Sequence, residues 1–173
     1  DNDGTNSTPQ TITVTIDDVN DNAPVFTSDA AVTIDENTTD VVTLTTTDAD
    51  TNPTVSYSIT GGADGASFAV NESTGDLTLI AAADYESDKT SYEVIVTATD
   101  NDDKNSTPQT ITVTIEDVND NAPVFTSTAT PEIDENTTDV VTLVTTDADT
   151  NPTVTYSITG GADGASFAVN EST

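Results

Sequence analysis

The feature that most constrains this chain is an internal repeat with a period of 99 residues. Residues 1–74 align with residues 100–173 without a gap, and 65 of these 74 positions are identical. A unit of this length has the size of one compact domain and is too long for a solenoid repeat. We therefore expect three parts, which together form a window of a longer array. Residues 1–21 are the C-terminal strand and linker of a partial repeat, residues 22–120 a complete repeat, and residues 121–173 the N-terminal half of the next.

Alternation of apolar and polar residues predicts β-strands along the complete repeat. Between Thr110 and Ile115 every second residue is apolar, so the three apolar side chains are expected to face a core, and residues 11–16 have the same six letters. The seven expected strands cover residues 32–34, 41–44, 55–59, 68–70, 77–80, 92–98 and 110–115. Seven short strands favour an all-β fold, a seven-stranded Greek-key β-sandwich of the immunoglobulin-like kind. We expect two antiparallel sheets in each unit, and units repeated in a linear array.

The charge balance excludes several classes of function. The chain has 32 acidic and two basic residues, a formal net charge of −30, and neither Cys nor His. Such a chain repels a phosphate backbone, so no nucleic-acid partner is expected. It has no thiol nucleophile, no Ser-His-Asp triad and no metal site built on Cys or His. Its apolar runs are only a few residues long, which excludes membrane insertion.

Four short acidic clusters stand at the ends of expected strands. The clusters are residues 35–37, 48–50, 84–86 and 117–121, and the last one joins the complete repeat to the next unit. Two basic residues cannot neutralise so many carboxylates. Because the available ligands are nearly all oxygen atoms, we expect bound hard cations, above all Ca²⁺. The alternative for any single cluster is that its acids only keep a loop soluble.

The nine residues Asp117–Phe125 (DVNDNAPVF) resemble the linker between cadherin repeats, and residues 18–26 have the same letters. Three further clusters resemble cadherin motifs: the glutamate motif at residues 35–37, the Asp-x-Asp motif at residues 48–50, and the Leu-Asp-Arg-Glu motif at residues 83–86, which keeps its two acids. The near-identical, Thr- and Asp-rich units look most like prokaryotic cadherin-like tandem repeats of large surface adhesins or filaments. Classical cadherins that swap an N-terminal strand anchor it with Trp, which this chain lacks.

The resemblance implies about three Ca²⁺ ions at the complete junction. The outermost ion would take Glu36, Asp84, Glu86 and Asp120; the middle ion Glu36, Glu86, Asp117, Asp120, Asp149 and the carbonyl of Val118; the third Asn119, Asp147, Asp149 and the carbonyl of Asn121. At the preceding junction the corresponding residues are Asp18, Asn20, Asp21, Asn22, Asp48, Asp50 and Asp100. There we expect only the third site to be well formed. The loop after Asp50 is short, so Asn52 is our substitute for the backbone oxygen that this loop gives in the family.

The resemblance and the acidic clusters together predict a calcium-binding structural repeat that rigidifies an extracellular rod or filament, as a spacer of a cell-surface adhesin. The alternative is calcium-dependent homophilic or carbohydrate adhesion through the repeats themselves. Expected partners are neighbouring repeats and identical chains, at an extracellular or cell-surface location. A glycosidase would need a pair of carboxylates in a cleft. Asp84 and Glu86 are the best pair, but they lie in a calcium motif without an evident pocket, so we expect no enzyme.

Overall fold

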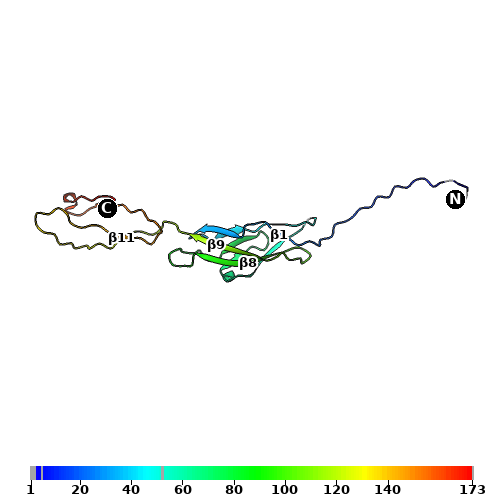
Figure 1. Cartoon of the computed structure of the whole chain (residues 1–173), viewed down its shortest axis with the longest axis horizontal. Helices are drawn as coiled ribbons and strands as arrows, with labels where there is room; N and C mark the ends of the chain where they lie inside the picture. Colours follow the sequence, from blue (N-terminus) through cyan, green and yellow to red (C-terminus); the bar gives the residue numbers. More distant parts are fainter. Residues whose placement is uncertain (1–2, 5, 52, 173) are drawn as a thin grey trace.

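The computed structural model describes residues 3–4, 6–51 and 53–172. It is elongated, with an extended N-terminal segment, a central body that holds nearly all the strands, and a C-terminal segment of looser build (Figure 1). We use "central body" for residues 25–116, "N-terminal segment" for residues 6–21 and "C-terminal segment" for residues 122–172. Among the described residues, we find no helix with the length and apolar character that crossing a membrane requires.

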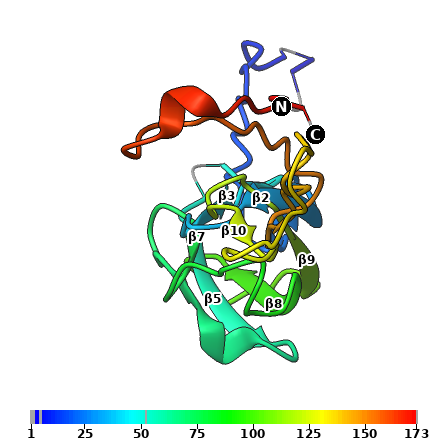
Figure 2. The ribbon, with the colours of Figure 1, turned by 90° about the vertical axis from the view of Figure 1, so that its left-hand side faces the viewer.

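The strands of the central body form two main sheets and one short pair. The elements are β1 (Val25–Phe26), β2 (Ala31–Asp35), β3 (Asp40–Thr43), β4 (Thr46–Thr47), β5 (Ser56–Gly61), the 3-10 helix η1 (Gly65–Ser67), β6 (Phe68–Val70), β7 (Asp76–Leu79), β8 (Ser91–Thr99) and β9 (Gln109–Glu116). One sheet has the order β2-β9-β8-β5, the second has the order β3-β7-β6, and β1 pairs with β4. Seen along the long axis, β5, β8 and β9 lie together, apart from β3 and β7 (Figure 2).

All seven predicted strands are present, which confirms the predicted β-sandwich. Two details differ from the prediction. The short pair β1–β4 was not expected, because two-residue strands have no visible alternation. The expectation of purely antiparallel sheets was also wrong, since β2 pairs with β9 in parallel, with Ala31 opposite Thr112 and Asp35 opposite Glu116. The parallel pair means that the first long strand and the last strand run in the same direction. The chain therefore enters the central body at one end and leaves it at the other.

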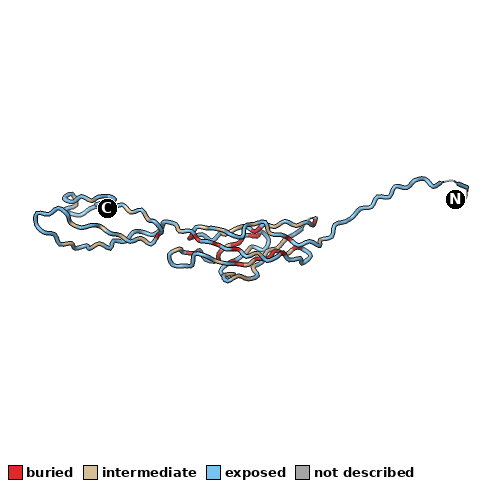
Figure 3. Tube along the Cα trace, in the orientation of Figure 1, coloured by how far each residue is buried: buried red, intermediate tan, exposed pale blue. Residues whose placement is uncertain are grey.

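The core lies between the two main sheets and is built by the predicted alternation. Along β9, Ile111, Val113 and Ile115 are buried, while the threonines between them are exposed. From β8, Val94 and Val96 are buried against them, and Leu44, Phe68, Leu77 and Leu79 complete the core from the opposite side. Figure 3 shows that buried residues are concentrated in the central body. Burial of these side chains is the main stabilising contribution to the fold.

The N-terminal segment does not form the strand that its sequence predicts. Residues 11–16 have the same six letters as residues 110–115 in β9, yet no strand is assigned to them. Ile12, Val14 and Ile16 are 75%, 78% and 90% exposed. In the central body, β9 is paired with β2 and β8 on its two edges, and its apolar face packs into the core between the two main sheets. Among the described residues no strand pairs with the N-terminal segment, and a strand's preference reflects its packing more than its own backbone.

The C-terminal segment has fewer strands than the equivalent residues of the central body. Its described elements are β10 (Val124–Phe125), β11 (Thr145–Thr146) and the 3-10 helix η2 (Gly164–Ser166), and β10 pairs with β11 as β1 pairs with β4. Ile133 and Phe167 are 52% and 55% exposed, and they line an open groove. Pro131 stands where the central body has Val32 in β2. Proline has no backbone N–H to donate to a sheet, so a strand is disfavoured at this place.

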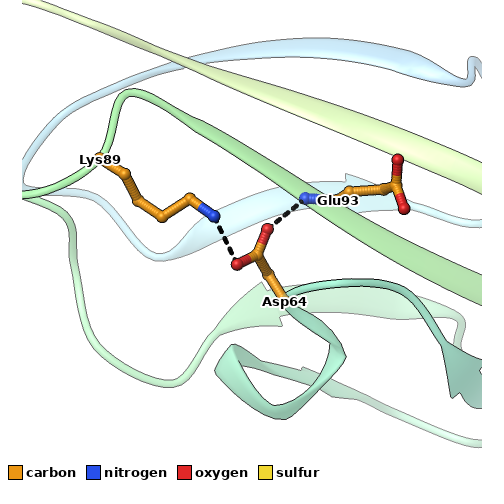
Figure 4. A network of polar contacts seen from close by, with 3 residues as sticks. All are labelled: Asp64, Lys89 and Glu93. Carbon is orange, nitrogen blue, oxygen red and sulfur yellow. Dashed lines mark hydrogen bonds and ion pairs between the residues drawn. The ribbon is translucent and has the colours of Figure 1, made fainter.

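A lysine fastens the loop of η1 to β8. Lys89 Nζ lies 2.5 Å from Asp64 Oδ1, and the N–H of Glu93 donates to Asp64 Oδ2 at 2.8 Å (Figure 4). The ammonium also lies 5.0 Å from the ring centre of Tyr92, in the geometry of a cation–π contact. Bonding to Lys89 first, and to the Glu93 N–H second, lowers the pKa of Asp64. One of the chain's two basic residues is thus engaged away from the predicted metal ligands.

Candidate metal centre

Glu36 is the organising side chain at the end of the central body where the chain leaves it. It follows β2 directly, and its N–H donates to the carbonyl of Glu116 at 2.9 Å, which extends the β2–β9 pairing by one bond. The side chain is 2% exposed. Its Oε2 accepts the N–H of Tyr85 at 2.7 Å and its Oε1 accepts the N–H of Val118 at 2.8 Å. One buried carboxylate therefore holds the predicted acidic loop and the linker together.

Five predicted ligands gather around this point in two overlapping groups. Carboxylate oxygens of Glu36, Glu86 and Asp117 lie within 4.8 Å of one another, and so do those of Glu86, Asp120 and Asp149. Glu86 belongs to both groups. The residues come from the central body, from the linker and from the C-terminal segment. Parts of the chain far apart in sequence thus bring like charges together at one junction.

The crowding is visible in the pKa of Glu86. Removal of its carboxyl from water, together with the neighbouring carboxyls of Asp117, Glu36 and Asp84, raises the pKa of Glu86 to about 7. Asp117 behaves in the opposite way. Burial alone would raise the pKa of Asp117, but hydrogen bonds from Thr150 and from Glu86 lower it overall. Without a counter-ion, one carboxyl of the group keeps a proton so that its neighbour can be ionised.

The linker is also bonded to the C-terminal segment. The N–H of Asn121 donates to Asp149 Oδ2 at 3.1 Å, and its side-chain amide donates to Asp149 Oδ1 at 2.9 Å. The N–H of Thr150 donates to Asp117 Oδ2 at 2.6 Å. Asp147 Oδ1 accepts the N–H of Asp149 at 3.2 Å, so the Asp-x-Asp motif is a tight turn whose second acid is buried. These bonds place Asp149 opposite the linker.

The preceding junction repeats this pattern 99 residues earlier. The N–H of Asn22 donates to Asp50 Oδ2 at 2.9 Å, and the N–H of Thr51 donates to Asp18 Oδ2 at 2.7 Å. Carboxylate oxygens of Asp48, Asp50 and Asp100 lie within 4.8 Å of one another. Both Asp50 and Asp100 are buried. These three acids belong to the set that the resemblance implies for the third ion at that junction, together with Asn20 and Asn22.

The Asn20 side chain completes this group. With its amide nitrogen turned toward the acids, it donates to Asp50 Oδ2 at 2.6 Å and to Asp100 Oδ2 at 3.1 Å. With the amide turned the other way, the same side chain would present an oxygen to a cation. Asp21 accepts a bond from the Asn22 amide at 3.1 Å and remains exposed.

Both junctions fit a hard divalent cation. Among the described residues, Asp117 Oδ1 and Asp48 Oδ2 are two of three buried side-chain oxygens without a hydrogen-bond partner. A buried carboxylate oxygen without a partner is costly. One such atom lies in a carboxylate group at each junction. The surrounding atoms that could bind a metal are carboxylate and amide oxygens. That ligand chemistry suits Ca²⁺ and offers nothing to a metal that prefers nitrogen or sulfur.

Asp84, Asp147 and Asn119 are among the predicted ligands that lie outside the carboxylate groups. Asp84 Oδ1 accepts the N–H of Glu86 at 3.1 Å, so it shapes the loop that carries Glu86. Asp147 shapes its own turn, as described above, and Asn119 is exposed. Asn52 lies outside the described residues.

One contact at the junction was not predicted from the sequence. The side-chain amide of Asn37 donates to Asp120 Oδ2 at 2.7 Å. The signal that could have revealed it is an asparagine directly after the motif glutamate. Asparagine is the residue other than glycine that most readily adopts the left-handed conformation found there.

Comparison with known proteins finds a matching family model and several relatives. A family model described as Cadherin domain matches residues 30–116. Protocadherin Fat 4 of Mus musculus is 40% identical over 96 residues, which covers 52% of this chain and 2% of that protein. Cadherin-23 of Mus musculus is 42% identical over 94 residues, which covers 50% of this chain and 3% of that protein. The chain therefore spans only a small part of the length of the curated relatives it matches.

Solved structures of cadherin ectodomains share the fold. The protocadherin gammaB7 EC3-6 cis-dimer structure aligns with a TM-score of 0.67 and 28% identity, covering 95% of this chain and 44% of that chain. Mouse cadherin-23 EC22-24 aligns with a TM-score of 0.57 and 29% identity, covering 90% of this chain and 53% of that chain. Both alignments reach beyond the central body, so the likeness includes the junction.

Proposed function

The chain belongs to the cadherin family, and from that premise we propose that it is a calcium-binding structural repeat that rigidifies an extracellular rod or filament. Cadherin domains generally bind Ca²⁺, and acidic clusters of suitable chemistry are present here. The proposal goes further in three respects: it names the residues that hold the ions, it gives the number of ions, and it states that the bound ions stiffen the junction.

One observation carries the proposal: Glu86, Asp120 and Asp149 share a single group although they belong to three different parts of the chain. A cation bound there would have ligands from both units and from the linker at once. Rotation of one unit against the other would then require breaking ligand bonds. Binding free energy would thereby become stiffness of the junction and stability of the fold.

The charges favour about three ions at this junction. The seven carboxylates expected to take part are Glu36, Asp84, Glu86, Asp117, Asp120, Asp147 and Asp149. Three divalent cations would bring six positive charges to them and nearly neutralise the site. Without the cations, like charges at these separations repel, and the simplest relief is for the units to swing apart. The expected ligands include the carbonyls of Val118 and Asn121.

We propose the spacer role for the repeat, rather than adhesion by the repeats themselves. The supporting observation is the near-identity of the units, with 65 of 74 aligned positions equal, because a dedicated adhesive domain needs a surface of its own. Such arrays of Thr- and Asp-rich units support the finer assignment to prokaryotic cadherin-like surface proteins. The relatives compared above come from animals, so this finer assignment stays a prediction. Clumping of beads coated with the chain in the presence of Ca²⁺ would favour the adhesive alternative.

The proposed location is outside the cell. Extracellular calcium modules typically have dissociation constants of about 10⁻⁴–10⁻³ M, which suits a calcium-rich medium. The proposed partners are neighbouring repeats of the same array and identical chains in a filament. The family and the relatives are adhesion proteins rather than enzymes. Glu86 already belongs to both carboxylate groups, so we propose no glycosidase role for Asp84 and Glu86.

The test combines thermal melting with small-angle X-ray scattering, in Ca²⁺ and in chelator. We expect Ca²⁺ to raise the melting temperature and to give a longer, stiffer particle. Asp120→Ala should abolish most of the stiffening, while Asp29→Ala, an acid outside every cluster, should leave it intact. Identical melting and scattering in Ca²⁺ and chelator would overturn the proposal.

A further inference from the structure

Asn37 connects the central body to the linker without any metal. It follows Glu36, and its backbone is in the left-handed region with a φ of 61°. Its N–H donates to the carbonyl of Ala83 at 2.9 Å, and its side-chain amide donates to Asp120 Oδ2 at 2.7 Å. Asn37 and Asp120 are 83 positions apart in the chain. A single residue thus reaches the acidic loop with its backbone and the linker with its side chain.

The conformation of Asn37 is set by its local sequence and not by the linker. Residues 134–139 repeat the letters of residues 35–40, and Asn136 has a φ of 66°. In both copies the threonine after the asparagine donates its hydroxyl to the carbonyl three residues earlier, at 2.6 Å for Thr38 and 2.7 Å for Thr137. The turn therefore forms in the same way in each copy. Of these two asparagines, Asn37 is the one whose side-chain amide is recorded with a linker carboxylate as its partner among the described residues.

We propose that Asn37 is a positioning residue, which holds the Asp120 carboxylate at the junction before a cation arrives. This inference rests on the proposed function. Asp120 Oδ2 accepts the Asn37 amide and Oδ1 accepts the Asn121 amide at 3.0 Å. A carboxylate oxygen has two lone pairs, so each oxygen keeps one for a metal. Asp120 is exposed, and in the absence of such bonds its side chain would have to be ordered when the ion binds.

The energetic effect is expected in the metal affinity rather than in the stability of the fold. A single hydrogen bond between exposed groups contributes little to folding. Residues that orient metal ligands behave differently, and their removal typically costs about 10–100-fold in metal affinity. Asn37 orients one ligand of several, so we expect the lower end of that range, about 10-fold.

The deciding variant is Asn37→Gly, with Asn136→Gly as its matched control. Glycine accepts a positive φ, so each change removes a side-chain amide and leaves the turn unstrained. Calorimetric titration should show Ca²⁺ binding about 10-fold weaker in Asn37→Gly than in the unchanged chain, and Asn136→Gly should bind as the unchanged chain does. Equal affinity of the two glycine variants would overturn the inference.

A second measurement in chelator separates this inference from the proposed function. Backbone ¹⁵N relaxation of residues 118–121 should show faster local motion in Asn37→Gly and no change in Asn136→Gly. If the unchanged chain binds no Ca²⁺ but the linker still loosens in Asn37→Gly, the proposed function fails and the positioning contact stands. If the linker motion is the same in all three proteins, the positioning role is wrong, whatever the affinities.

Discussion

The N–H of Val118 donates to Oε1 of Glu36 at 2.8 Å, and through this bond the linker is attached to a carboxylate that is 2% exposed. The other oxygen of Glu36 accepts the N–H of Tyr85. Neither bond needs a cation. Glu36 therefore has two tasks: it fastens the end of the central body, and it is available as a ligand. Loss of the Glu36 side chain should therefore lower the stability of the central body both without metal and with it.

Glu36→Ala is expected to destabilise the central body in chelator. The substitution leaves the backbone N–H groups of Tyr85 and Val118 without their carboxylate acceptor, and each hydrogen bond to a charged group contributes about 1.5–3 kcal/mol. Glu135→Ala makes the same change at the equivalent position of the C-terminal segment, where the side chain is exposed, and should have almost no effect. Urea unfolding in chelator measures both. Equal midpoints for the two variants would contradict this reading of Glu36.

The stability of the metal-free protein should fall as the pH rises from about 4.5 to about 7. The pKa of Glu86 is raised to about 7 from its ordinary value of 4.5, so in this window the folded state holds a proton that the unfolded state has lost. Raising the pH through this window removes that proton from the folded state and lowers the free energy of unfolding. Asp117 affects the stability at lower pH and in the opposite direction. Because its pKa is lowered, its contribution is present above about 3.8 and is lost in stronger acid.

Glu86→Gln provides the check on this pH dependence. Glutamine has no titrating group, so thermal melting in chelator should depend less on pH between about 4.5 and 7 than in the unchanged chain. Glu72→Gln alters an exposed acid away from the junction and should keep the original slope. If the melting temperature of Glu86→Gln depends on pH as strongly as that of the unchanged chain, other groups are responsible for the pH dependence.

Gly62→Ala is expected to be far more harmful than Gly161→Ala, although the two glycines are equivalent in the repeat. Both have a positive φ, 100° and 103°, so both substitutions carry a backbone strain of about 1–2 kcal/mol. A Cβ on Gly62 would lie 2.6 Å from Val94 Cα and 2.7 Å from the carbonyl of Glu93, whereas the nearest atom at Gly161 is 3.9 Å away. The difference between the two unfolding free energies measures the close approach of the loop to β8. Equal losses would mean that strain alone matters.

Much of the fold follows from local pattern, and the part that does not depends on neighbours. Alternation located the seven strands of the two main sheets, since the two sheets bury one face of each against a common core. The parallel pairing of β2 with β9 could not be predicted in this way, because alternation shows which face is apolar and not which strand lies alongside. The C-terminal segment has fewer strands than the equivalent residues of the central body for a related reason. Pro131 replaces Val32, and the partner strands that bury the first half of the central body have no counterpart among its described residues.

The candidate site was predictable to a similar degree. The acidic clusters were visible in the letters, and the resemblance of these motifs to those of cadherins implied which carboxylates meet. Glu86, Asp120 and Asp149 lie together in the structure although they are distant in sequence. The contact of Asn37 with Asp120 was missed, since it depends on one backbone turn and one side-chain direction. Such orientation is a property of the assembled junction.

The identical segments at residues 11–16 and 110–115 allow a direct test of how far neighbours decide a strand. Ile111 is fully buried in β9, whereas Ile12, with the same flanking letters, is 75% exposed. Replacing a buried isoleucine by alanine typically costs about 2–5 kcal/mol through lost burial and the cavity left behind. We therefore expect Ile111→Ala to lower the unfolding free energy of the central body by that amount, and Ile12→Ala to leave it unchanged. Chemical denaturation of the two variants under one set of conditions measures the difference. A comparable loss in Ile12→Ala would mean that the N-terminal segment is packed in solution, in contradiction to the exposed segment described above.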